Sequence, residues 1–218
     1  MRTMVVLASL ALATPAAAQS RLFAPADDAP AISFRPFVTV GSERFAASQT
    51  FKAVFGTDTT AEWGGGLDVV FGHGRVFAEV DASRLTKSLV GDRVFVNAGQ
   101  VFNMGIPLRA SIKPFDASVG VRFNRSPRIV PYLGVGFASY HYTEQSDFAD
   151  ASENVDTTKV GPMVRGGAEV RVSRWLGVAL DLQYTSITGI LGNGGASKEF
   201  GESDLGGFAA GVKFVVGR

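Results

Sequence analysis

Large apolar residues alternate with small or polar residues along most of the chain, and this period of two is typical of β-strands. In residues 176–185 every second residue is large and apolar, and the intervening positions hold glycine, alanine or polar residues. The same alternation occurs in seven further segments, at about residues 34–41, 63–71, 76–83, 115–123, 133–140, 164–172 and 205–216. The pattern therefore predicts an all-β fold in which each strand has one oily face.

The connections between these segments alternate in length. Three are tight turns, at residues 72–74, 124–128 and 173–174, and four are long, at about residues 42–62, 88–106, 143–159 and 187–204. In an up-and-down barrel the odd-numbered connections all lie at one end, and here every odd-numbered connection is long. Outer-membrane barrels have short periplasmic turns and long extracellular loops. We therefore expect an eight-stranded antiparallel up-and-down transmembrane β-barrel.

One segment, residues 93–123, is too long for a single strand of this size, and its apolar phase changes near Lys113 and Pro114. We predict a hairpin tip at Gly91 and Asp92, then an irregular stretch, and then a strand from about Leu108 with a bulge at Pro114. Counting residues 93–102 as a strand would give nine strands and long loops at both ends. A ten-stranded barrel is the remaining alternative.

Period two alone does not distinguish a membrane barrel from a soluble lipocalin-like barrel, whose oily face points inward. The exterior of a soluble barrel should carry many long, solvated side chains. Here the second face is mostly glycine, alanine and serine, which suits a narrow eight-stranded interior. Aromatic residues near strand ends fit interfacial girdles, namely Trp63, Phe71, Phe123, Tyr140, Tyr142, Trp175 and Phe214. We therefore place the oily face outside.

The same assignment turns a nearly balanced set of charged residues inward, where charges must be paired. Acids on the second and third strands would lie between Arg35 and Arg122, and Asp181 would lie between Arg165 and Lys213. The favoured interpretation is a structural network that closes the lumen and fixes strand register; the alternative is a selective water path. The inward charges are Arg35, Asp68, Glu79, Asp81, Asp116, Arg122, Arg165, Glu169, Arg171, Asp181 and Lys213.

The N-terminus has the pattern of a secretory signal peptide. Arg2 precedes an apolar stretch and a small-residue cleavage site at residues 16–18. We expect a signal peptide at 1–18, a flexible lead at 19–33 and a barrel at 34–218. Removing residues 1–18 takes away one base and no acid, which leaves 20 Lys and Arg against 20 Asp and Glu. The balance gives no basic excess for nucleic acid, and the absence of cysteine excludes disulfides and thiolate sites.

With these features the chain resembles the small outer-membrane β-barrel families typified by outer-membrane proteins A, X and W. The resemblance covers about residues 34–216 and rests on stretches such as GGGLDVVFGHGRVFAEVDASR, VPYLGVGFASYHY, RWLGVALDLQYTSI and DLGGFAAGVKFVVGR. It implies a bacterial outer-membrane location and insertion by the barrel-assembly machinery. That machinery usually reads a terminal aromatic, whereas here Phe214 is followed by four more residues.

Two loops carry candidate sites. The loop at 143–159 holds an acid at about every third position, which would suit divalent cations bridging lipid phosphates or a plain solvated loop; these acids are Glu144, Asp147, Asp150, Glu153 and Asp156. In the loop at 42–62, Ser48 as N-cap and Gly56 as C-terminal stop predict a short helix. Its apolar face, Phe51, Val54 and Phe55, would pack locally, plug the barrel mouth, line a ligand entrance or lie in the lipid interface.

Catalysis is not expected. The chain has two histidines, and His73 lies in a tight turn between glycines. Ser139 and His141 share a strand face, as a His and a Ser do in a lipid deacylase on an eight-stranded barrel. The order is reversed here, and no orienting carboxylate lies on that strand face.

The sequence thus favours an integral outer-membrane barrel with a structural or surface-interaction role and a largely closed lumen. The alternative is a narrow channel for small, including apolar, solutes, and the remote alternative is a lipid-modifying enzyme. We expect no cofactor and no metal, a monomer, and membrane lipid and lipopolysaccharide as partners.

Overall fold

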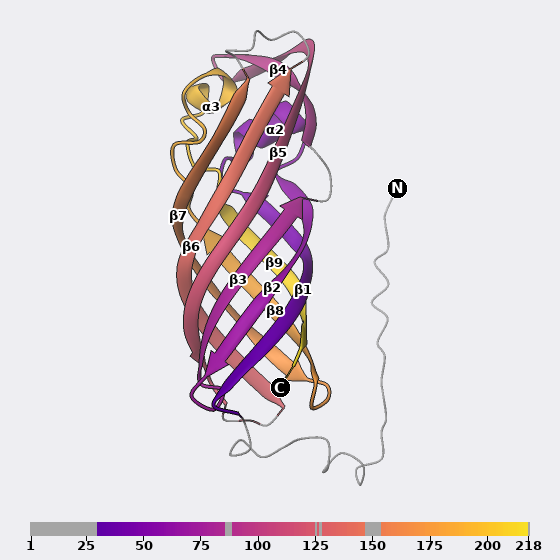
Figure 1. Ribbon diagram of the computed structural model, residues 1–218. Helices are drawn as coiled ribbons and strands as arrows, with labels where there is room; N and C mark the ends of the chain where they lie inside the picture. The colour runs from indigo at the N-terminus through magenta and orange to yellow at the C-terminus, as the bar shows by residue number, and fades with distance from the viewer. Residues whose placement is uncertain (1–29, 86–88, 125, 127, 147–153, 218) are drawn as a thin grey trace, which may run out of the picture.

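The chain folds into an elongated β-barrel with two short helices at one end (Figure 1). The computed structural model describes residues 30–85, 89–124, 126, 128–146 and 154–217. The predicted signal peptide and most of the predicted lead therefore lie outside the described residues. In chain order the elements are β1 Ile32–Phe45, α2 Ser48–Phe55, β2 Thr59–Phe71, β3 Val76–Leu85, β4 Leu89–Asn97, β5 Gln100–Arg122, β6 Ile129–Ser146, β7 Val155–Arg171, β8 Leu176–Thr185, α3 Gly195–Glu199 and β9 Gly207–Val216.

Eight of the strands form the closed ring that the sequence predicts. The hydrogen-bonded order is β3-β2-β1-β9-β8-β7-β6-β5, and β5 pairs back with β3 to close the ring. All these pairings are antiparallel. The tight turns lie at the end of the barrel where the chain finishes, and the helices and long connections lie at the other end (Figure 1). We call these the short-turn end and the loop end.

The ninth strand, β4, corrects the prediction for the segment after residue 88. It pairs only with the loop-end half of β5, and the hairpin turns at Ala98 and Gly99, both of which have positive φ, rather than at Gly91 and Asp92. The predicted irregular stretch is therefore regular strand. The predicted bulge at Pro114 is also wrong, because that residue stays in regular register opposite Tyr140; the irregularity lies between Asp92 and Val94.

The apolar phase change near residue 113 has a different cause, which is an inversion of polarity along a continuous strand. Between Val121 and Phe115 the outward positions of β5 are apolar, and the inward positions include Asp116. Beyond Pro114 the outward positions hold Lys113 and Arg109, whereas the inward positions hold apolar side chains. The side chains of β5 continue to alternate between inward and outward without a break. The change in polarity therefore reflects a change in the environment outside the barrel wall.

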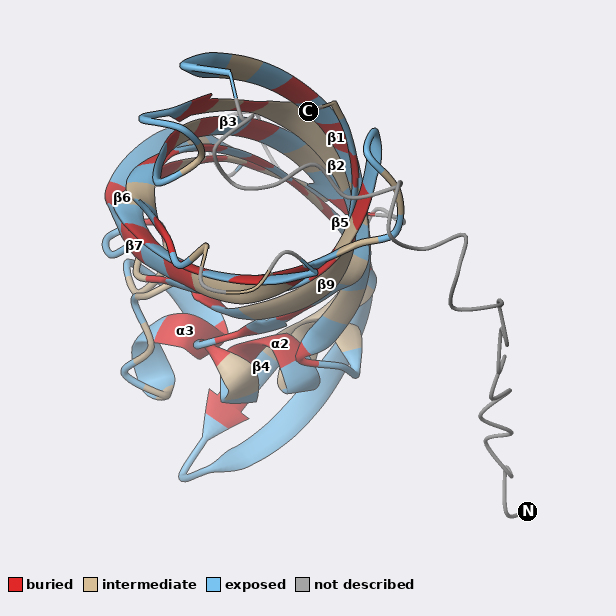
Figure 2. Ribbon diagram, turned by 90° about the horizontal axis from the view of Figure 1, so that it is seen from below, coloured by how far each residue is buried: buried red, intermediate tan, exposed pale blue. Residues whose placement is uncertain are grey.

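The exterior of the ring is an apolar belt. Exposed and buried positions alternate along much of the wall (Figure 2). Leu180, Val135 and Phe34 are 57–66% exposed. A contiguous belt of large apolar side chains exposed to this degree is unusual on the surface of a soluble protein. The proposed girdle residues Trp63, Phe71, Phe123, Trp175 and Phe214 are also accessible. Two members were assigned wrongly: Tyr140 and Tyr142 point inward and are each 2% exposed, because each occupies an inward position of β6.

Helix α2 forms where the loop sequence predicts it, but its N-terminus differs. The N-cap residue is Ala47, and Ser48 is the first helical residue. The free amides of Gln49 and Thr50 instead donate to the Glu202 carboxylate, at 3.1 and 2.8 Å, which ties α2 to the chain after α3. The helix ends at Gly56 in the left-handed conformation, as expected. No helix in the described part of the chain is long and apolar enough to cross a membrane.

Candidate functional site: the filled lumen

The lumen of the ring holds the charged residues assigned to it from the alternation pattern. Ten of the eleven are buried, each 8% exposed or less, and Arg171 is half-buried at the short-turn end of β7. The ten come from seven of the eight ring strands and are Arg35, Asp68, Glu79, Asp81, Asp116, Arg122, Arg165, Glu169, Asp181 and Lys213. Their side chains occupy the lumen in successive levels.

The level nearest the short-turn end centres on Glu169 of β7. Its Oε2 atom accepts from Arg35 at 2.7 Å and from Arg122 at 2.8 Å. These distances are typical of charge-assisted hydrogen bonds. Because β9 and β8 separate β1 from β7 in the ring, the Arg35 contact spans the lumen. Arg35 was expected to face the acids of the adjacent strands; it pairs with Glu169 instead because long side chains reach across so narrow a barrel.

The middle level is a four-residue network. The Glu79 carboxylate accepts from Lys213 Nζ at 2.6 Å and is also paired with Arg165. Asp181 lies 3.5 Å from Arg165 Nη2 and 3.8 Å from Lys213 Nζ, and accepts from the Tyr132 hydroxyl at 2.5 Å. Lys213 Nζ also lies 4.2 Å from the centre of the Phe37 ring. Two acids and two bases thus join β3, β7, β8 and β9.

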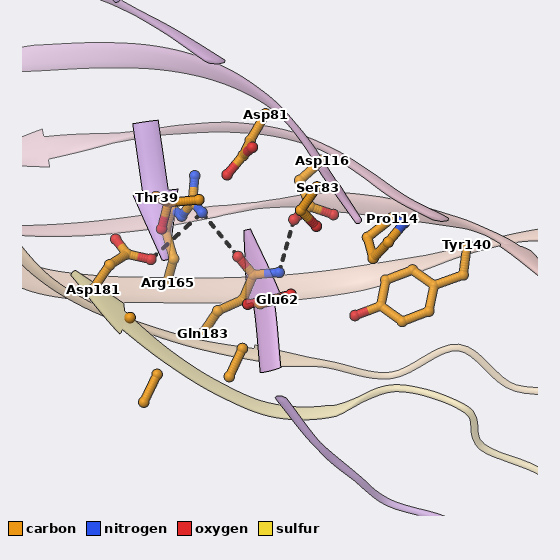
Figure 3. Close-up of a pocket in the computed structure, with 13 residues that line it drawn as sticks. Thr39, Glu62, Asp81, Ser83, Pro114, Asp116, Tyr140, Arg165, Asp181 and Gln183 are labelled. Carbon is orange, nitrogen blue, oxygen red and sulfur yellow. Dashed lines mark hydrogen bonds and ion pairs between the residues drawn. The ribbon is translucent and has the colours of Figure 1, made fainter. Parts of the chain in front are cut away.

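The level above it is built around Gln183. The alternation of side chains along β8 places this residue inward, but because it is uncharged it is not among the predicted inward charges. Its Oε1 accepts from Arg165 at 2.9 Å, and its Nε2 donates to Asp116 at 2.9 Å (Figure 3). A cavity of about 30 Å³ lies here, lined among others by Glu62, Asp81 and Asp116, and is large enough for water. A smaller cavity of about 10 Å³ lies beside Glu79 and Glu169. The Arg165–Glu79 pair joins residues that line the two cavities.

Above the charges, at the loop end, the interior becomes apolar. The Tyr140 hydroxyl donates to Glu43 at 2.6 Å, which marks the transition. Beyond it a cluster of buried side chains fills the mouth: Phe45, Ala47, Phe51, Leu85, Leu89, Ala110, Ile112, Ala138, Tyr140, Tyr142, Met163, Ile187, Ile190 and Leu205. We call this cluster the mouth layer. Phe51 of α2 is 1% exposed and stacks on Phe45 with ring centroids 4.2 Å apart, so the apolar face of α2 plugs the mouth.

A cluster of ion pairs stabilises the connection between β1 and β2, which contains α2. Asp58 accepts from Arg44 Nε at 3.0 Å and from Lys52 Nζ at 3.1 Å. The hydrogen bond from Lys52, supported by Arg44, holds the pKa of Asp58 below its usual value. These contacts secure both ends of the connection between β1 and β2.

The acidic loop offers no metal site in the described residues. Asp147, Asp150 and Glu153 lie outside them, and no cluster of three potential ligands occurs in the part of the chain that the structure describes. Glu144 accepts from the Tyr142 hydroxyl at 2.5 Å, so it contributes to the rim of the mouth layer.

Ser139 and His141 lie on the outward face of β6, where the structure adds one feature that strand-by-strand reasoning missed. Asp156 of β7 lies 3.8 Å from His141 Nδ1, and Thr158 Oγ1 lies 3.0 Å from the same nitrogen. Among the described residues, no hydrogen bond joins Ser139 to His141. A nucleophile, base and orienting acid in mutual contact are therefore not assembled. His73, the other histidine, lies in the tight turn after β2 with φ of 57°.

A closed ring with an apolar exterior and a charged interior defines the class of transmembrane β-barrels. The chain belongs to the outer membrane protein beta-barrel domain family, whose model matches residues 4–215. The protein is accordingly an outer-membrane barrel. No curated protein matches the sequence.

Three solved barrels illustrate the similarity. The N-terminal β-barrel domain of Pseudomonas aeruginosa OprF is 12% identical, covering 85% of this chain and 97% of its own, with a TM-score of 0.46. Ail, the attachment invasion locus protein of Yersinia pestis, is 10% identical, with coverages of 86% and 96% and a TM-score of 0.49. OprG from Pseudomonas aeruginosa is 11% identical, with coverages of 86% and 95% and a TM-score of 0.47. Similarity at this level does not transfer function.

Proposed function

We propose that this protein is a closed outer-membrane barrel with a structural or surface-interaction role, rather than a channel. It would be exported to a Gram-negative outer membrane by its signal peptide, inserted by the barrel-assembly machinery, and remain a monomer surrounded by lipid and lipopolysaccharide. The observation that carries the proposal is that two separate regions of the lumen are filled by side chains. Ion pairs fill its membrane-spanning part, and the mouth layer fills the loop end above them.

The two fillings support closure in different ways. The Arg165–Glu79–Lys213 group crosses the lumen at mid-height, and a solute would have to separate buried ion pairs to pass it. In the mouth layer, Phe51 and Leu205 are 1% exposed or less, so the loop-end opening is packed like a protein core. The cavity of about 30 Å³ between them holds a few waters at most.

The surface-interaction role is supported by the β4–β5 hairpin, which projects beyond the ring at the loop end (Figure 1). Phe95 and Phe102 face each other across it with ring centroids 6.5 Å apart, and they are 58% and 49% exposed. Met104 is 55% exposed on the same hairpin. Exposed apolar groups of this size on a projecting element are typical of interaction surfaces.

Planar-bilayer conductance of the pure refolded protein tests the proposal. A filled lumen predicts no resolved unitary steps, for the wild type and also for Phe51→Ala, because the charged levels stay in place when the mouth layer is loosened. An Arg165→Ala/Gln183→Ala variant removes the side chains around the cavity and should raise ion leakage. Reproducible steps from the wild type, with insertion verified by gel mobility, would show a narrow channel instead.

Lipid A analysis tests the absence of catalysis. After incubation of the refolded protein with lipopolysaccharide, mass spectrometry should find the acyl count of lipid A unchanged. A loss of acyl chains that His141→Ala abolishes would establish a lipid-modifying enzyme and refute this part of the proposal.

A further inference from the structure

Two cationic residues lie just above the apolar belt, on the outward faces of the neighbouring strands β3 and β5. The ladder between these strands reaches Ala82 opposite Phe115. Arg84 and Lys113 each lie two residues further toward the loop end, so both project from the same outward face, and both are exposed. The paired ladder ends just before them, so the two residues project from neighbouring strands at the same level of the wall without forming a directly opposed pair.

Neither cation has an ion-pair or hydrogen-bond partner in the described part of the chain, whereas the four buried cations of the lumen are held by carboxylates within the barrel; they are Arg35, Arg122, Arg165 and Lys213. Like charges at the same level of neighbouring strands repel each other, and an anion bound between them would relieve that repulsion. The pair therefore has the charge and the freedom to bind a ligand outside the protein.

The neighbouring side chains show at which depth this ligand would lie. Trp63 of β2 is directly opposite Arg84 and is 55% exposed, and Phe115, the outward residue before Lys113, is 52% exposed. Tryptophan is typical of the interface between hydrocarbon and headgroups. The two cations thus lie where the headgroups of the outer leaflet begin, with acyl-chain contacts directly below them.

We propose that Arg84 and Lys113 form a site for the phosphate groups of a lipid A-type glycolipid in the outer leaflet. Arginine matches phosphate oxygens with two parallel N–H donors, and lysine adds a compact charge. Trp63 and Phe115 contact the acyl chains of the same molecule. This inference assumes the membrane orientation of the proposed function but not its closed lumen, so conductance results do not affect it.

The chain offers a local reporter for the test. It has two tryptophans, and Trp175 lies at the short-turn end, next to the turn at 173–174. In a Trp175→Phe background the fluorescence of Trp63 reports on the site alone. We would titrate this protein, folded in neutral detergent micelles, with bisphosphorylated lipid A, with dephosphorylated lipid A and with phosphatidylglycerol.

Bisphosphorylated lipid A should bind at least tenfold more tightly than the other two lipids. Arg84→Gln/Lys113→Gln should weaken its binding at least tenfold, at about fivefold per cation, and 1 M salt should weaken wild-type binding because screening then acts within about 3 Å. The matched control is Arg75→Gln/Arg174→Gln, which removes two exposed charges at the short-turn end and should bind like the parent.

Three results would overturn the inference: equal binding of dephosphorylated lipid A, equal binding of phosphatidylglycerol, or equal affinities of the site variant and the control. Since both substitutions are on the outer surface, folding of the variant is checked by circular dichroism and gel mobility before the titration. A double variant that fails to fold is replaced by the single variants Arg84→Gln and Lys113→Gln, each of which should weaken binding about fivefold.

Discussion

The two halves of the barrel interior obey opposite rules, although the same strands build both. In the half toward the short turns, the interior holds the buried ion pairs beside a small apolar cluster, and the exterior is apolar; in the loop-end half, the interior is mainly apolar and the exterior carries Lys113, Arg109 and Arg44. The difference follows from the surrounding medium. Where lipid surrounds the wall, polar groups are satisfied inside; where water does, apolar groups are buried inside as in a soluble protein.

This contrast shows that a strand's polarity pattern records the solvent on each side, not the continuity of the backbone. Strand β5 keeps one register through residue 113, where its apolar residues change sides. The position of the change therefore marks the membrane boundary on that strand.

The largest effect should come from Glu79→Ala, which removes the closer of the two carboxylates that Arg165 and Lys213 share in the lumen and leaves both cations with the more distant Asp181 alone. Removing one partner of a buried ion pair costs about 3 to 5 kcal/mol. Urea titration of the protein folded in lipid vesicles measures the free energy of unfolding. Glu199→Gln, which removes an exposed acid of α3, is the control and should be within about 0.5 kcal/mol of wild type; equal losses in both variants would refute the network's structural role.

In the mouth layer, Phe51→Ala removes a buried ring that stacks on Phe45. A loss of about 3 to 4 kcal/mol is typical of such cavities, but it should appear as local opening of the α2 region rather than unfolding of the ring. Hydrogen exchange of the α2 amides measures it. Faster exchange throughout β8 and β9 would show instead that the two halves are one cooperative unit.

On the lipid-facing side, Leu180→Arg places a charge at the middle of the apolar belt and should destabilise the protein by about 2 to 4 kcal/mol. Thr158→Arg, which lies outward on β7 above the belt, should have little effect. Both are compared by urea titration in vesicles. If the two substitutions cost the same, the belt does not end where the polarity inverts.

The smallest effect concerns the loop ion pairs. Because its partners lower the pKa of Asp58 in the folded protein, the stabilisation is present above the unfolded value, about pH 4, and is lost as the pH falls through the lower folded value. Asp58→Asn should therefore increase hydrogen exchange of α2 slightly at pH 7 and leave it unchanged in strong acid. A difference that grows on acidification would contradict this account.

The sequence predicted the eight ring strands, the alternation of connection lengths and the inward face, because each is a local consequence of period two. It did not predict β4 or the full length of β5, since the inversion at Lys113 has the same appearance in sequence as a broken strand. The partners of the lumenal charges were also beyond local reasoning. Arg35 reaches Glu169 across the barrel, and such contacts depend on lumen width rather than on strand neighbours.

The most direct test of the polarity inversion uses single cysteines, which the chain allows because it has none of its own. Val119→Cys, Phe115→Cys, Ser111→Cys and Arg109→Cys place a fluorescent probe at outward positions along β5, and quenchers dissolved in lipid or in water report the surroundings of each. The account predicts lipid quenching at 119 and 115 and aqueous quenching at 111 and 109. Lipid quenching at 109, or aqueous quenching at 119, would contradict it.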